Sequence, residues 1–361
     1  MRKEIYPTFD RLRFPLILMV VFIHAQFSIQ GDPLDASLYG VVSHFFTVVI
    51  SQVAVPLFFF ISGCLYFRDY KVFSLVLYGQ KQKRRIKTLI VPFITWNSFF
   101  WLLFSLFVLL APALVNGGIP NIAHATIKDV IWVYWGDSTG GPIDFPLWFI
   151  RDLITVTVLS PLIYFVIMKY RIGVVAMLIL LGLWLFSVPV PVLGNNICLC
   201  LFFFSLGGYL NKVMQYKVDL NLPLLTDGLG GGILIFVFLL LSVLSTINYY
   251  EWKHSLVSII SIKGLVLVGI PAMYALVSKY YVCFDKCKEI IPADCVFFIF
   301  ASHGFLITVI KRIIERLTID NQIVYTLLYF AIVFISIAIC VFFYKGIKIV
   351  SPKLLSYLTG R

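Results

Sequence analysis

An arginine and a histidine share one face of the first apolar segment of this chain. Arg13 and His24 are eleven residues apart in "FDRLRFPLILMVVFIHAQFS", residues 9–28. At about 100° per residue, this spacing is three helical turns plus about 20°, and it places the side chains roughly 16 Å apart along the axis. An ionisable side chain at membrane depth costs roughly 2.5–3.5 kcal/mol, so it usually serves a function. Imidazole titrates near neutral pH and can take a proton from a hydroxyl and return it.

The same residues also have purely structural interpretations. His24 can be a core histidine bonded to a nearby carbonyl, and Arg11 or Arg13 can anchor the helix at the cytoplasmic membrane edge. Asp10, three residues before Arg13, can form a helix-end ion pair with it or fix the guanidinium for another partner. Because Arg13 and His24 share a face, the functional interpretation stays open beside these.

A basic run precedes the third apolar segment. It reads "GQKQKRRIKTLIVPF", residues 79–93, and as a cytoplasmic loop it would set the topology or attract anionic lipid. Clustered Arg and Lys side chains also bind phosphate through charge-assisted hydrogen bonds. Arg84, Arg85 and Lys87 are therefore candidate ligands of a phosphorylated donor.

Two later segments carry ionisable residues one turn or more inside a helix. In "FPLWFIRDLI", residues 145–154, Trp148 fits an interfacial anchor, and Arg151 can snorkel outward or face a cavity that binds a polar acceptor. In "FIFASHGFLI", residues 298–307, His303 lies in mid-helix. Taken alone, His303 is read as structural.

The composition is that of an integral membrane protein. Of the 361 residues, 61% are hydrophobic and 13% are charged, whereas soluble domains are about 45–50% apolar and about 25% charged. The net charge of +12 would suggest nucleic acid only on a soluble domain, and none is expected. No cleavable signal peptide is expected either.

Hydrophobic segments of about 20 residues predict an all-α polytopic fold with about ten transmembrane helices. We expect one membrane domain over residues 1–350 and a short cytoplasmic tail over 351–361. The expected helices are 13–30, 39–67, 89–113, 146–168, 172–190, 196–211, 229–247, 256–278, 294–312 and 323–345.

Loop charges predict that both termini are cytoplasmic. The termini and alternate loops on one side hold 22 of the 29 Lys and Arg residues, and the opposite loops hold five. Positive charge gathers on the cytoplasmic side of membrane proteins. One segment disagrees, because Lys311, Arg312 and Arg316 fall on the opposite side.

The seven cysteines do not predict a disulfide framework or a metal site. Five fall in expected helices, and Cys283 and Cys287 fall in an expected cytoplasmic loop without a second ligand pair for zinc. We expect no metal and no tightly bound cofactor.

Taken in order, these segments resemble the acyltransferase-3 family of integral-membrane acyltransferases. That family begins with an Asp, then an Arg and a His with ten residues between them, here Asp10, Arg13 and His24. "VPLFFFISGCL" (residues 55–65), "RRIKTLIVPF" (84–93), "LWFIRDLI" (147–154) and the His303 segment resemble its later motifs. Two departures are Phe14-Pro15 after the arginine and "FASH" before the late histidine.

The resemblance implies O-acylation, commonly O-acetylation, of a carbohydrate in the cell membrane. The donor would be an acyl-coenzyme A, expected to be acetyl-coenzyme A, and the acceptor a glycan or lipid-linked sugar. His24 would act as general base or carry the acyl group, with Arg13 and Asp10 as catalytic partners. The donor would be bound by Arg84, Arg85 and Lys87. The acceptor would be bound by Arg151, Trp148 and His303.

Two other classes of function remain open. A multi-pass transporter or flippase would also place ionisable residues at mid-membrane, although it usually shows inverted repeats and interrupted helices. A structural or regulatory membrane protein would explain the hydrophobicity but not the pairing of Arg13 with His24. The oligomeric state is not indicated.

Overall fold

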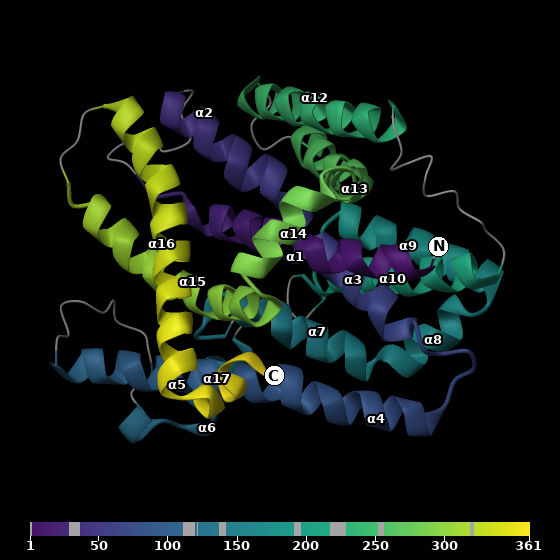
Figure 1. Cartoon of the computed structure of the whole chain (residues 1–361), viewed down its shortest axis with the longest axis horizontal. Coiled ribbons are helices and arrows are strands. Elements are labelled where there is room, and N and C mark those ends of the chain that lie inside the picture. The colour runs from purple at the N-terminus through teal and green to yellow at the C-terminus, as the bar shows by residue number, and fades with distance from the viewer. Residues whose placement is uncertain are drawn as a thin grey trace. The chain divides into compact units, whose positions relative to one another are not determined.

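The computed structural model describes residues 2–28, 37–110, 120, 122–136, 142–190, 196–216, 229–251, 256–317 and 321–361. Every regular element in these ranges is a helix (Figure 1), which confirms the predicted all-α class. Each of the ten expected segments contains a helix, but the described residues 26–28 and 186–190 lie beyond the helix ends. The ends expected at 29–30 and 111–113, and the loop residue Lys253, lie outside the described residues.

Six helices in the described ranges are long and apolar enough to cross a membrane, and a bent pair makes up to seven. The six run over Leu38–Phe67, Leu75–Leu110, Leu229–Tyr250, Val257–Lys279, Ala293–Ile314 and Gln322–Val350. The bent pair, Phe145–Val158 and Ser160–Ile167, turns by 62°. Two further apolar helices, Arg171–Leu185 and Ile197–Lys212, are shorter. Ten spans therefore stay a prediction.

The contacts divide the chain into two compact units, whereas the sequence predicts one membrane domain over 1–350. The first unit comprises residues 1–66 and 206–343, and the second comprises 67–205 and 344–361. The candidate residues Asp10, Arg13, His24 and His303 belong to the first unit, and the others belong to the second.

Helix α1 (Arg2–Ala25) is the packing centre of the first unit. It contacts α13 (Leu256–Lys279), α14 (Tyr281–Ile290), α15 (Ala293–Ile314) and the π-helix η1 (Phe45–Ile50), which follows α2 (Leu38–His44). Its side chains Leu12, Leu16, Ile17 and Val21 are fully buried. Spacings of four and five residues place these side chains along the inner surface of the helix.

Close helix approaches in the first unit require glycine. A Cβ on Gly207 of α10 (Ile197–Tyr216) would overlap the Phe60 carbonyl of α3 (Ala54–Phe67) and lie 2.9 Å from the Cys64 nitrogen. A Cβ on Gly269 of α13 would lie 2.8 Å from Phe238 of α12 (Leu229–Glu251). At Gly207 a larger residue would meet backbone and force the helices apart, whereas at Gly269 the side chains of Val53 and Phe238 would have to move.

The second unit holds α4 (Leu75–Arg85), the π-helix η3 (Ile86–Ile90), α5 (Val91–Leu110), α6 (Ile127–Trp135), α7 (Trp148–Val158), α8 (Ser160–Ile167) and α9 (Tyr170–Leu185). The expected C-terminal tail forms α17 (Pro352–Thr359), which packs on α5 with the Trp96 indole donating to the Leu358 carbonyl at 2.9 Å. Gly360 ends α17 at φ +71°, and a Cβ there would lie 2.7 Å from the Thr88 Cα. Glycine alone fits this left-handed, crowded position easily.

The basic run 79–87 is helical, so its interpretation as a loop was wrong. Ser74 caps α4 by accepting from the Leu77 amide at 3.3 Å, and the helix continues through η3 into α5. Gln, Lys, Arg and Leu all have high helix propensity, and no proline lies between Ser74 and Pro92. A π-helix such as η3 often marks a functional site.

The predicted orientation can be tested with a native cysteine. Cys283 on α14 is exposed, whereas the other six cysteines are buried or partly buried. If the cytoplasmic assignment is right, an impermeant maleimide should label Cys283 in inverted vesicles and spare it in intact cells. Cys283→Ser is the control. Reporter fusions that placed residues 71–85 outside the cytoplasm would contradict a cytoplasmic donor site.

Candidate active site

His24 lies in the last turn of α1, not at the centre of its helix as the expected segment 13–30 implied. The helix ends at Ala25, because a side chain forms hydrogen bonds with the backbone just beyond it. The Tyr39 hydroxyl donates to the Phe27 carbonyl at 2.7 Å and accepts from the Phe27 amide at 2.9 Å. These hydrogen bonds replace those that the Phe27 backbone would form in a further helical turn, and they hold the chain that follows His24 in place.

Side chains from two other elements hold the end of α1. The Thr47 hydroxyl of η1 donates to the Phe22 carbonyl at 3.0 Å, and the Tyr329 hydroxyl of α16 (Gln322–Val350) lies 2.9 Å from that of Thr47. The last carbonyls of a helix lack intrahelical partners, so such bonds satisfy them. A catalytic imidazole on this turn would be held rigidly.

The His24 ring faces a second imidazole, that of His303 on α15. The two ring centroids are 5.4 Å apart. His303 is fully buried and lies near the middle of the 22-residue α15, so the contact puts His24 at the mid-height of a membrane-length helix. The sequence had placed both histidines at membrane depth, but had not paired them.

Hydrogen bonds determine which nitrogen of the neutral His303 ring carries the proton. Its Nδ1 lies 3.0 Å from the Ile299 carbonyl oxygen and 2.8 Å from that of Phe300. Both partners accept, so in the neutral ring Nδ1 carries the proton and Nε2 carries the lone pair. Nε2 is buried and has no hydrogen-bond partner among the residues that the structure describes. His303 can therefore accept a proton or a hydrogen bond at Nε2.

Lys311 explains part of the charge that disagreed with the predicted orientation. Its ammonium lies 3.4 Å from the His24 carbonyl oxygen, at the negative end of the α1 dipole. Glu315, which follows α15, accepts from the Ser28 amide at 3.2 Å. Sequence reasoning missed both residues, although the misplaced positive charge was a signal.

The two arginines near the middle of α1 have separate carboxylate partners. Arg13 pairs with Asp10 at 2.9 Å and is 33% exposed, so the helix ion pair is present. Arg11 makes two bonds to Asp285 of α14, at 2.7 and 2.8 Å. Hydrogen bonding to Arg11 lowers the pKa of Asp285 below its ordinary value. Arg11 therefore ties α1 to α14 besides any role as an anchor.

In the second unit, the donor candidates are accessible on helical surface. Arg84 and Lys87 are exposed and Arg85 is partly buried. The structure therefore leaves at least two cations available to a phosphate.

Arg151 is buried, with 5% of the residue exposed, and this contradicts outward snorkelling. It donates through Nε to Asp152 at 2.9 Å and through Nη1 to the Trp135 carbonyl, and its guanidinium lies 5.6 Å from the centre of the Trp135 ring. These partners satisfy the buried charge within the protein. Trp148 is partly buried at the start of α7.

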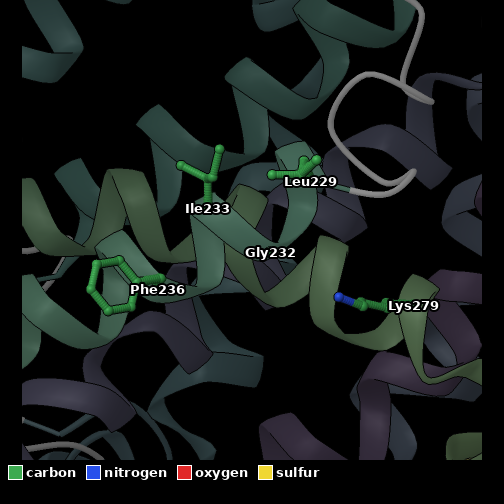
Figure 2. Close-up of a pocket in the computed structure, with 5 residues that line it drawn as sticks. All are labelled: Leu229, Gly232, Ile233, Phe236 and Lys279. Carbon is green, nitrogen blue, oxygen red and sulfur yellow. The ribbon is translucent and has the colours of Figure 1, made fainter.

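Two hollows lie along the seam between α12 and α13 in the first unit. One, of about 560 Å³, is apolar except for Lys279. Figure 2 shows Lys279 extending toward Gly232, beside Leu229, Ile233 and Phe236. The other, of about 590 Å³, has a polar part. In the described ranges, no group of three His, Cys, Asp or Glu side chains could hold a metal ion.

A known family covers most of this chain. The model of a family described as an acyltransferase domain matches residues 6–345. The chain belongs to this acyltransferase family. The succinoglycan biosynthesis protein ExoH of Rhizobium meliloti is 27% identical over 368 residues, which cover 97% of this chain and 90% of that protein. No solved structure matches the chain.

Membership confirms the resemblance carried by the Asp10, Arg13 and His24 motif and its successors. The matched residues include every candidate site residue. The chain is thus an O-acyltransferase, and its apolar helices make it a multi-pass membrane protein.

Proposed function

We propose that this acyltransferase moves an acyl group, expected to be acetyl, from a coenzyme A thioester to a hydroxyl of a carbohydrate at the cytoplasmic membrane. The observation that carries the proposal is the pair of imidazoles at the rigid end of α1, with Nε2 of His303 available beside His24. The relative named for succinoglycan biosynthesis supports a carbohydrate acceptor.

The chemistry needs one proton acceptor beside the hydroxyl. The hydroxyl oxygen attacks the thioester carbonyl carbon, the carbon–sulfur bond breaks, and the ester forms. His24 takes the hydroxyl proton and returns it to the departing thiolate, so the ring ends the cycle neutral. His24 is only partly buried, which leaves room for substrate contact.

His24 could instead carry the acyl group on a ring nitrogen. The two routes differ in whether an acyl-enzyme forms before the acceptor is added. Rapid quenching with radiolabelled acetyl-coenzyme A in the absence of acceptor separates them, because direct transfer leaves no label on the protein.

Arg13 and Asp10 are proposed to position the donor. The ion pair uses two of the five N–H groups of the guanidinium, Nε and one on Nη2. The remaining donors suit a phosphate or a carbonyl oxygen. Arg151 and Trp148 stay proposals for the acceptor side.

The donor site predicts a loss of binding on charge removal. Changing Arg84, Arg85 and Lys87 together to Gln should weaken acetyl-coenzyme A binding at least about tenfold, because one hydrogen bond to a charged group is worth about 1.5–3 kcal/mol. Equilibrium binding of radiolabelled acetyl-coenzyme A to purified protein in nanodiscs would measure this.

A matched variant controls for net charge. Lys345, Lys348 and Lys353 are exposed and fall on the same predicted side of the membrane, so changing them to Gln removes the same charge. Equal affinities in the two triple variants would mean that the basic helix sets only topology.

The whole proposal is tested by acyl transfer itself. Membranes with the protein should move label from acetyl-coenzyme A into surface glycan or its precursor, and mass spectrometry should find the acyl group on a sugar hydroxyl. A transporter or a scaffold would transfer no label.

A further inference from the structure

The second hollow between α12 and α13 carries polar groups that the proposed chemistry does not use. The two helices run antiparallel, because the Asn248 amide donates to the Ser261 hydroxyl at 3.4 Å near one end and Gly232 lies against Lys279 near the other. The volume of about 590 Å³ falls in the range of ligand pockets, about 300–1,000 Å³.

The sequence dictates this lining through helical spacing. On α13 the lining residues are 261, 264, 265 and 268, and on α12 they include 241, 244, 245 and 248. Both sets follow the i, i+3, i+4, i+7 pattern of one helix face. Five lining side chains are aliphatic, and Ser245, Asn248 and Ser261 are polar. The hollow is therefore amphipathic by sequence.

Ser245 contributes to the lining of this hollow a buried hydroxyl without a partner in the described part of the chain. Its neighbours Ser242 and Thr246 donate to carbonyls one turn back, at 2.7 and 3.0 Å. Ser245 is only 5% exposed, and its hydroxyl has no hydrogen-bond partner among the described residues. An unsatisfied buried hydroxyl costs about 1–3 kcal/mol. Of these three residues only Ser245 lines the hollow, while Ser261, which also lines it, donates to the Val257 carbonyl at 2.7 Å.

The shape also leaves room for an occupant. A Cβ built on Gly264 would meet no atom within 4 Å, so the glycine keeps the hollow open beside the polar cluster. The Asn248 amide uses one hydrogen on Ser261 and has further donor and acceptor positions. The Tyr249 ring, one turn beyond Ser245, is stacked on His44 with centroids 3.8 Å apart.

We propose that this hollow binds the acceptor as a sugar carried on a lipid chain. The sugar hydroxyls bond to Ser245, Asn248 and Ser261, and the chain lies along the aliphatic side chains. This inference rests on the proposed function, because it names the acceptor class. An alkyl chain alone would leave the Ser245 hydroxyl unsatisfied, so the polar cluster favours a glycolipid over a plain acyl chain.

The π-helix η1 links this hollow to the candidate active site. It contacts α12, α13 and α1. His44, directly before η1, stacks on Tyr249 beside the hollow, and Thr47 within η1 bonds the Phe22 carbonyl at the end that carries His24. The segment η1 therefore contacts both the helices that line the hollow and the helix that carries His24.

Photolabelling tests the site without relying on acyl transfer. The probe is dodecyl β-glucoside with a diazirine in the alkyl chain, applied to the full-length protein in zwitterionic nanodiscs. Label should map to peptides of α12 and α13. Unlabelled dodecyl glucoside should compete, whereas glucose and dodecylphosphocholine should not. Equal competition by dodecylphosphocholine would overturn the proposal, because the hollow would then be an ordinary lipid contact.

Variants with matched controls sharpen the test. Gly264→Leu should reduce labelling about tenfold without loss of fold, because the side chain enters open space and leucine favours helix. Gly182→Leu, at another helical glycine with nothing within 4 Å, should label normally. Ser245→Ala should weaken competition by the glucoside roughly threefold to tenfold, and Ser242→Ala should not.

The outcomes separate the two proposals. Undiminished labelling in Gly264→Leu would overturn the glycolipid site whatever the enzyme does. If the glucoside binds as expected but membranes transfer no acyl group to any glycan, the proposed function fails and the site remains.

Discussion

His24→Ala is expected to abolish acyl transfer while the protein still folds and inserts. General acid–base catalysis typically contributes about 10²–10⁴-fold in rate, so kcat should fall by at least about a hundredfold. Folding should survive, because the hydrogen bonds at the end of α1 involve backbone groups of Phe22, His24 and Phe27 that alanine retains. The measurement is the transfer of radiolabelled acetyl to glycan acceptor by purified protein in nanodiscs.

His124→Ala is the control for this experiment. His124 is an exposed imidazole in the second unit, so its removal should leave the rate unchanged. Unchanged binding of acetyl-coenzyme A by His24→Ala would show that the donor site is intact. A rate within threefold of the wild type would assign His24 a structural role, and the base would have to be sought elsewhere.

The sequence predicted His24 more readily than its surroundings. Helical periodicity shows which residues share a face of α1, so it predicts that Arg13 and His24 lie on one face. The contacts that hold the His24 turn join distant parts of the chain: Lys311 lies 287 positions from His24, and Tyr329 lies 282 from Thr47. Helical periodicity gives no information on such pairs.

Lys311 shows why a positive charge can lie on the side opposite to the predicted cytoplasmic side. The rule that places positive charge in the cytoplasm describes loops that meet water. A lysine at the end of a helix can instead place its ammonium on another helix's last carbonyls, where the helix dipole favours it. The disagreement between the position of Lys311 and the predicted orientation was therefore a sign of a tertiary contact.

The helical basic run is a different kind of error. Charge density alone suggested a loop, although Ser74 and the following Leu, Gln, Lys and Arg residues predict a capped helix. The helix propensity of these residues was sufficient to predict the helix, but the interpretation followed the high density of charge instead. Local propensity could not predict the ion pair of Arg11, because its partner Asp285 lies 274 positions away.

His303→Asn is expected to lower kcat roughly 10–100-fold, the range typical when a residue that orients a functional ligand is lost. The ring is fully buried and its Nδ1 proton is taken by the Ile299 and Phe300 carbonyls. A fully buried ring reaches a sugar poorly, so we expect His303 to act through His24: its Nε2, which lacks a partner in the described ranges, would accept a hydrogen bond from the protonated His24 ring and stabilise that form. Asparagine keeps a polar group of similar reach but cannot accept a proton.

The split between kcat and KM distinguishes this role from acceptor binding. A positioning residue should lower kcat, leave the acceptor KM within about twofold, and shift the pH profile of kcat, because the base would lose the neighbour that stabilises its proton. Ser302→Ala, which removes the adjacent hydroxyl bonded to the Phe298 carbonyl, controls for local repacking and should change neither. A raised acceptor KM with normal kcat in His303→Asn would instead place His303 in contact with the acceptor.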